Sequence, residues 1–116
     1  MPVVTVGEST PATYNDPELT ERVFTSLTNK LGSNQVQKVS PVMGAEDFAH
    51  FGRVEPKIPS LMFWLGGVSK EDVKLAKEGK KLPSLHSPFF APDREATLKG
   101  GVEAMTEAVL ELLGKN

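Results

Sequence analysis

The apolar run I-P-S-L-M-F-W-L-G-G, residues 58–67, constrains the fold of this chain more than any other segment. It predicts a buried strand that ends at two glycines, with Trp64 in the core. A weaker strand signal, Q-V-Q-K-V-S-P, occupies residues 35–41, and M-G-A-E-D-F-A-H-F-G, residues 43–52, indicates a turn into a short helix. Strand, helix and strand within about 30 residues predict a βαβ unit with parallel strands. We therefore expect an α/β fold.

Two longer segments have helical patterns. In the first, Asp16 can cap a helix with Pro17 at its first position, and Gly32 supplies a stop. Its apolar stripe recurs in steps of four: Leu19, Val23, Leu27 and Leu31. The second runs from about Asp93 to Leu113 and ends before Gly114. Its apolar face, expected to pack against the sheet, consists of Leu98, Val102, Met105, Val109 and Leu112.

Two other segments complete the expected elements. Residues 3–6, V-V-T-V, indicate a short strand, and the charged residues 69–81 indicate an exposed connector with one or two helical turns. Gly100 and Gly101 inside the last helix each cost about 1 kcal/mol relative to alanine, which predicts that this helix packs closely on a neighbour.

Composition excludes several classes of protein. A chain of 116 residues has room for one domain, and its apolar runs are too short to span a membrane. With a net charge of -2 and no basic patch, nucleic acid is not an expected partner. The absence of cysteine excludes disulfides and thiolate metal sites. The N-terminus lacks the basic start and apolar core of a signal peptide, so we predict a cytoplasmic protein.

Candidate chemistry gathers in two loops that follow the expected parallel strands. Ligands of such sheets bind outside the carboxyl ends of the strands. The loop around Gly44–Phe48 and the long connection that carries His86 both leave such ends, so we expect them on one rim of the sheet. Pro83 and Pro88 stiffen the second loop, L-P-S-L-H-S-P-F-F-A-P-D, residues 82–93.

The local sequence leaves the role of each candidate open. His86 suits a metal ligand but also an ordinary surface histidine. Glu46 and Asp47 can be ligands or an acid/base pair, or can simply stabilise the first turn of a helix. Gly44 can admit a substrate anion to backbone N–H groups, or can be a plain turn residue. His50 suits the end of the short helix. With two histidines and no cysteine, the chain cannot assemble a conventional zinc site by itself.

Four stretches, in order and spacing, resemble a known family. They are P-A-T-Y-N-D-P-E-L-T-E-R-V, P-V-M-G-A-E-D-F-A-H-F, P-S-L-M-F-W-L-G-G and L-H-S-P-F-F-A-P-D-R-E-A-T-L-K-G-G-V-E-A-M. The chain from about Thr10 onward resembles the C-terminal part of the aminoacylase/carboxypeptidase metallopeptidases. The resemblance is to their amidohydrolase branch, which includes hippurate hydrolases, N-acyl-amino-acid amidohydrolases and auxin-conjugate hydrolases.

The resemblance implies a chemistry and a set of site residues. Such enzymes use two divalent ions (Zn, Mn, Ni or Co) to activate the water that hydrolyses the amide bond of an N-acyl amino acid. His86 matches the last metal ligand, and Gly44, Ala45, Glu46 and Asp47 match a loop at the substrate end of the site. The other ligands and the general base belong to family segments that are not present here. We therefore expect this chain alone to hold no ion stably and to be inactive.

The resemblance also implies an architecture. Residues 15–116 correspond to part of a zinc-exopeptidase-like catalytic domain, a partial three-layer sandwich with a mostly parallel sheet and flanking helices. Residues 1–14 correspond to the last strand of an inserted lid domain and the re-entry segment. On this interpretation the chain is a fragment. The alternative is a stand-alone or trans-complementing α/β interaction module, which forms a homo-oligomer through an exposed sheet edge or pairs with a missing N-terminal part.

Overall fold

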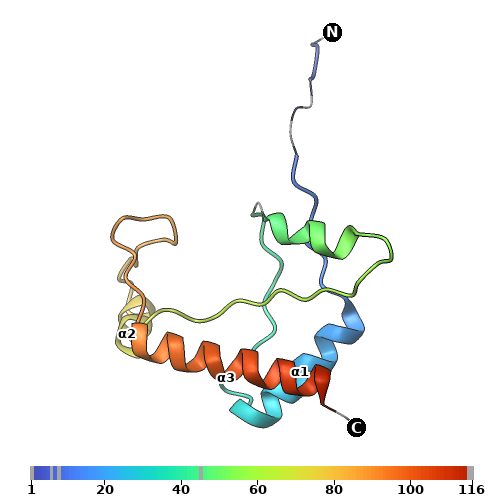
Figure 1. Ribbon diagram of the computed structural model, residues 1–116. Helices are drawn as coiled ribbons and strands as arrows, with labels where there is room; N and C mark the ends of the chain where they lie inside the picture. The colour runs from blue at the N-terminus through green and yellow to red at the C-terminus, as the bar shows by residue number, and fades with distance from the viewer. Residues whose placement is uncertain (1, 6, 8, 45, 115–116) are drawn as a thin grey trace. The chain divides into compact units, whose positions relative to one another are not determined.

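Every regular element in the residues that the computed structural model describes, which are 2–5, 7, 9–44 and 46–114, is a helix. Its elements are α1 (Pro17–Leu31), the 3-10 helix η1 (Asp47–Arg53), α2 (Lys70–Lys77) and α3 (Arg94–Leu113) (Figure 1). The backbone divides into two compact units, Met1–Phe63 and Trp64–Asn116. The first unit contains α1 and η1, and the second contains α2 and α3.

The expected sheet is the main error of the sequence interpretation. None of the described residues forms a strand, so the prediction of an α/β sandwich with a mostly parallel sheet is wrong. Residues 35–41 and 58–65 have no regular secondary structure, and neither do residues 3–5; residue 6 lies outside the described part. The assignment of residues 1–14 to a lid domain stays a prediction.

The apolar run 58–67 shows why no strand forms. A strand buried on both faces needs neighbouring strands for its backbone and covering elements for its side chains. Here the Asn15 side chain takes the place of a neighbouring strand: its Nδ2 donates to the Met62 carbonyl oxygen (2.8 Å), and its Oδ1 accepts from the Met62 N–H (2.9 Å). The Asp16 N–H donates to the Ser60 carbonyl oxygen (2.9 Å). Trp64 is 60% exposed, so its predicted place in the core is also wrong.

The α1 helix forms as its sequence predicts. The Asp16 carboxylate accepts a hydrogen bond from the Leu19 N–H (2.9 Å), and Pro17 occupies the first turn. Gly32 ends the helix with φ at +94°, a left-handed conformation that glycine adopts without steric cost. Val23 and Leu27 of the apolar stripe are buried. The structure confirms the predicted cap, stripe and stop.

The α3 helix has the predicted ends but not the predicted buried face. Asp93 caps it through a hydrogen bond from the Ala96 N–H (3.2 Å), and Gly114 ends it. The residues that it buries are Ala104 and Ala108. The side chains of the predicted apolar face are 42–69% exposed: Leu98, Val102, Met105, Val109 and Leu112. Without a sheet in the described part of the chain, this face lacks the surface that was expected to cover it.

The two glycines of α3 explain how Leu65 packs in the second unit. A Cβ atom added at Gly101 would lie 2.9 Å from Leu65 Cδ2, whereas one added at Gly100 would lie 4.0 Å from Leu65 Cδ1. The helix therefore packs closely on the Leu65 side chain at this pair, as the sequence predicted. No described helix has the length and apolar character that crossing a membrane requires.

Candidate functional site

The loop that carries His86 begins and ends at the same place in the second unit. The Asp93 N–H donates to the Gly67 carbonyl oxygen (2.8 Å), and Thr97 Oγ1 lies 3.4 Å from the Gly66 carbonyl oxygen. These two hydrogen bonds fix both ends of residues 68–92 beside the first turn of α3. The loop is therefore anchored by the carbonyl groups of Gly66 and Gly67 on one side and by Asp93 and Thr97 of the helix start on the other.

His86 lies in a tight turn within this loop. The Ser87 N–H donates to the Ser84 carbonyl oxygen (3.0 Å), which places Leu85 and His86 at the centre of the turn. A second turn follows at once, closed by the Phe90 N–H on the Ser87 carbonyl oxygen (3.0 Å). The Ser87 hydroxyl also accepts from the Phe89 N–H (3.2 Å). The histidine is exposed, so its imidazole is available to a partner outside this loop.

The charged part of the loop contains a small electrostatic cluster. Ser69 caps α2 by accepting from the Asp72 N–H (3.0 Å), and its hydroxyl donates back to the Asp72 carboxylate (3.0 Å). Lys80 Nζ lies 3.3 Å from the same carboxylate. The hydrogen bond from Ser69, and then the one from Lys80, lower the pKa of Asp72 below its ordinary value. This cluster ties the end of the connector back to the start of α2, which is the short helix predicted for residues 69–81.

The second candidate loop belongs to the first unit. Glu46 is the N-cap of η1, and its carboxylate accepts a hydrogen bond from the Phe48 N–H (3.1 Å). Asp47 is the first residue of the 3-10 helix. Its exposed carboxylate lies at the N-terminal end of that helix, where the helix dipole stabilises a negative charge. Gly44 has open space around it. Ala45, the remaining residue of the predicted substrate loop, lies outside the described residues.

One further candidate, His50, belongs to the same short helix. His50 is exposed in η1, whose last turn also holds Arg53. The rings of Phe48 and Phe51 lie 5.7 Å apart on this helix, and Ala49 between them is buried. The short helix thus places Phe48 and Phe51 against each other and buries Ala49. Glu46, just before it, caps its N-terminus. The substrate role predicted for Gly44, Glu46 and Asp47 stays a prediction.

The described residues do not fit a complete metal centre. Within residues 2–114, leaving aside positions 6, 8 and 45, no three His, Cys, Asp or Glu side chains gather closely enough to hold a metal ion. His86 belongs to the second unit and Gly44–Asp47 to the first. Their expected place on one rim rested on a sheet that these residues do not form, and it stays a prediction. His86 can supply only one ligand to a dinuclear centre.

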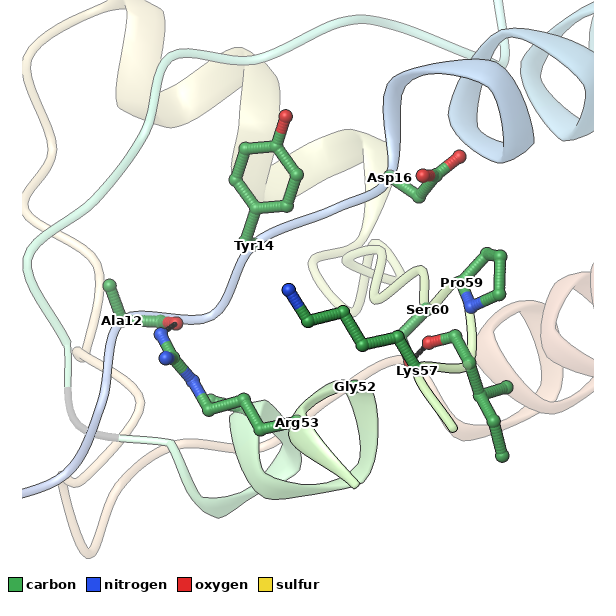
Figure 2. Close-up of a pocket in the computed structure, with 10 residues that line it drawn as sticks. Ala12, Tyr14, Asp16, Gly52, Arg53, Lys57, Pro59 and Ser60 are labelled. Carbon is green, nitrogen blue, oxygen red and sulfur yellow. Dashed lines mark hydrogen bonds between the residues drawn. The ribbon is translucent and has the colours of Figure 1, made fainter. Parts of the chain in front are cut away.

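A hollow in the first unit was missed by the sequence interpretation. It has a volume of about 520 Å³, and residues 12–16 and 49–60 line it (Figure 2). Arg53 joins the two segments through a hydrogen bond from its Nη2 to the Ala12 carbonyl oxygen (3.2 Å). The two segments are about 40 residues apart in the chain, so no local pattern announces the hollow. The only sequence signal for this hollow is a pair of nearby cations. Arg53 is the last residue of η1, and Lys57 lies in the segment without regular structure that follows it.

Comparison with known proteins gives one family and several relatives. Residues 3–111 match the Peptidase family M20/M25/M40. The chain is 35% identical over 106 residues to the thermostable carboxypeptidase 2 of Saccharolobus solfataricus, covering 91% of this chain and 23% of that protein. It is 36% identical over 92 residues to an N-acetyldiaminopimelate deacetylase of Enterococcus faecalis, covering 79% of this chain and 20% of that protein.

A second N-acetyldiaminopimelate deacetylase, from Limosilactobacillus fermentum, is 30% identical over 95 residues, covering 82% of this chain and 20% of the relative. The chain thus spans about a fifth of the length of the curated relatives that it matches. No solved structure matches it significantly. Because the family match covers nearly all of the sequence, the chain belongs to the Peptidase family M20/M25/M40, a family of hydrolases that use metal ions.

Proposed function

We propose that this chain is the C-terminal part of the catalytic domain of a dinuclear-metal amidohydrolase that cleaves the amide bond of N-acyl amino acids. One observation carries the proposal: in a chain of this family, L-H-S-P presents an exposed histidine on a tight turn, within a long loop whose two ends are tied to the first turn of α3. Such a loop holds an imidazole in a defined place, as a metal ligand requires. His86 is then one ligand, and the remaining ligands lie outside the described residues.

The names of the relatives support the substrate class. A deacetylase that acts on N-acetyldiaminopimelate removes an acyl group from an amino acid, and a carboxypeptidase cleaves the same kind of bond at a peptide end. Both reactions are amide hydrolysis next to a free carboxylate. We extend this to the amidohydrolase branch, whose members act on hippurate-like substrates, and we assign Gly44, Glu46 and Asp47 to the substrate end of the site.

A chimera tests the proposal. The matching part of the Saccharolobus solfataricus carboxypeptidase is replaced by residues 3–111 of this chain, and the product is assayed with zinc or manganese on N-acyl amino acids. We expect His86→Ala to reduce hydrolysis by a factor of at least about 10² and to lower the bound metal. His50→Ala is the matched control, because it removes the other histidine of the chain, and it should leave both quantities unchanged.

Two outcomes would count against the proposal. In one, the chimera with His86→Ala binds metal and hydrolyses substrate as well as its parent. In the other, the purified 116-residue chain alone hydrolyses hippurate with normal turnover in zinc or manganese, which would mean that it carries a complete site. If the chimera does not fold, the second assay and metal analysis of the purified chain still decide whether the site is complete.

A second candidate function, an interaction module, is favoured by the exposed face of α3. The five side chains of that face are 42–69% exposed, which is unusual for a regular apolar stripe on a long helix. A sheet edge cannot provide the contact, because the described residues contain no strand. Light scattering after size exclusion separates the candidates. A well-defined, metal-independent dimer supports the module, whereas irregular aggregation supports an incomplete catalytic domain.

A further inference from the structure

The hollow in the first unit has the charge and lining of a binding site for a small anion. Arg53 and Lys57 extend into it toward the segment that carries Ala12 and Tyr14 (Figure 2). Its volume of about 520 Å³ falls within the range of small-molecule pockets. No part of the proposed amide hydrolysis uses it, and all of its lining residues belong to the first unit.

The two cations have unused donors. Arg53 uses one N–H on the Ala12 carbonyl oxygen, which anchors the guanidinium at the edge of the hollow and leaves further N–H groups for a ligand. The Lys57 ammonium forms neither a hydrogen bond nor an ion pair with any residue of the described part of the chain. Two positive groups facing one hollow repel each other, so an anion between them removes an unfavourable interaction.

The one carboxylate at this hollow does not neutralise the cations. Asp16 accepts the hydrogen bond from the Leu19 N–H and offsets the positive end of α1. In Figure 2 its carboxylate points away from Lys57. The net charge that the hollow presents to a ligand is therefore positive.

The rest of the lining is largely apolar. It consists of Ala12, the ring of Tyr14, Ala49, Ile58 and Pro59. Ser60 contributes little polarity, because its hydroxyl already donates to the Ile58 carbonyl oxygen (3.0 Å). A fully polar anion such as inorganic phosphate would leave these walls without a partner, whereas an organic acid would cover them.

We propose that the hollow binds a small organic carboxylate, with the carboxyl group held between Arg53 and Lys57 and the apolar body against Tyr14 and Pro59. A guanidinium fork matches the two oxygens of a carboxylate, and the ammonium adds a second charge-assisted hydrogen bond. The inference is independent of the proposed function, because the ligand here meets no residue assigned to the metal site.

Benzoate is a suitable probe, because it joins a carboxylate to a compact apolar ring. Amide chemical shifts of the 116-residue chain are followed by NMR during titration with benzoate, benzamide and inorganic phosphate. We expect saturable shifts with benzoate at Gly52, Arg53 and Ser60, with a dissociation constant on the order of 1 mM. Benzamide, which lacks the charge, and phosphate, which lacks the apolar body, should each bind at least about fivefold more weakly.

A charge-matched pair of variants identifies the cation. Lys57→Gln should weaken benzoate binding about three- to fivefold, the effect expected for a solvent-exposed ion pair, and raised salt should weaken the wild-type binding similarly. Lys81→Gln removes the same charge from the second unit and should have no effect. Equal loss in both variants, shifts scattered away from the hollow, or equal binding of benzamide or phosphate would each overturn the proposal. The shift map of the wild-type chain decides the location even if Lys57→Gln does not fold.

Discussion

The two long helices both carry recurring apolar residues, but they differ in which of these residues the folded chain buries. In α1, Val23 and Leu27 are 2% and 6% exposed, so the stripe finds cover within this chain. In α3, Leu98 and Val102 are 69% and 67% exposed, and the helix buries only alanines. Both helices have an aspartate cap at the start and a glycine at the end. The difference therefore lies in what covers each face, which depends on segments far away in the sequence.

The strongest test of this comparison is a matched pair of leucine truncations. Leu27→Ala removes a side chain that is 6% exposed and should lower the free energy of unfolding by about 2–5 kcal/mol. Leu98→Ala removes the same atoms from a site that is 69% exposed and should cost less than about 0.5 kcal/mol. Denaturant unfolding of both variants measures the two values. Similar losses at every protein concentration would contradict the burial difference.

If the loss in Leu98→Ala grows with protein concentration, the α3 face is covered by a second copy in solution. Such a result would sharpen the comparison, because it would show that α1 is completed within the chain and α3 by association. Polar substitution at Met105, which is 55% exposed, provides a check in the same experiment. In a monomer this substitution should leave the free energy of unfolding nearly unchanged. In a dimer it should weaken association and so reduce the dependence of that free energy on protein concentration.

This comparison also explains which parts of the fold and the site sequence could predict. Asp16, Pro17 and Gly32 act on their immediate neighbours, so the ends of α1 follow from a few adjacent residues. The serines and prolines around His86 likewise indicate a turn from local chemistry, and a turn forms. A strand, in contrast, exists only where another strand supplies its hydrogen bonds, and residues 58–65 do not have one.

The hollow around Arg53 and Lys57 also depends on contacts between distant segments. It arises from the pairing of Asn15 with Met62 and of Arg53 with Ala12, contacts that join segments more than 40 residues apart. Nothing in residues 49–60 alone indicates that a partner segment will close over them. The local sequence was therefore enough to predict His86, which lies in a turn formed by its neighbours. It was not enough to predict Arg53 and Lys57, whose hollow forms only where two distant segments meet.

The aspartate caps of the two helices allow a second comparison. Asp16→Ala should lower the free energy of unfolding by about 1 kcal/mol, because the Leu19 N–H loses its acceptor at 2.9 Å. Asp93→Ala removes a longer hydrogen bond, 3.2 Å, and should cost the same or less. Asparagine at either position retains an acceptor and is the control. Thermal unfolding followed by circular dichroism measures all four variants, and an equal cost for alanine and asparagine would contradict the capping assignment.

The two adjacent glycines of α3 should respond differently to alanine substitution. Alanine in place of glycine inside a helix gains up to about 1 kcal/mol, and Gly100→Ala should gain most of it because its Cβ meets Leu65 only at 4.0 Å. Gly101→Ala should gain less or lose stability, because its Cβ would lie 2.9 Å from Leu65 Cδ2 and the leucine must move. The double variant Gly101→Ala/Leu65→Ala removes the obstacle and should recover the helix-propensity gain relative to Leu65→Ala alone. Equal melting temperatures for the two single variants would show that Leu65 does not rest on this glycine.

The smallest effect is expected in the connector, at Asp72. Its pKa is lowered by the hydroxyl of Ser69 and then by Lys80, so the ionised form is favoured in the folded chain. The resulting stabilisation is complete above the ordinary carboxyl pKa and is lost as the pH falls through the lowered value. Ser69→Ala should therefore raise the pKa of Asp72 and reduce the helicity of α2.

NMR titration of the Asp72 carboxyl measures this effect directly. Lys80→Gln should also raise the pKa of Asp72. Lys81→Gln removes the adjacent charge instead; it is the matched control and should leave the pKa of Asp72 unchanged. A helix as short as α2 gains little from packing, since none of its residues is buried, so its cap and this ion pair govern how often it forms. If Asp72 titrates alike in Ser69→Ala and in the wild type, the hydroxyl does not hold the carboxylate, and the start of α2 is fixed by backbone contacts alone.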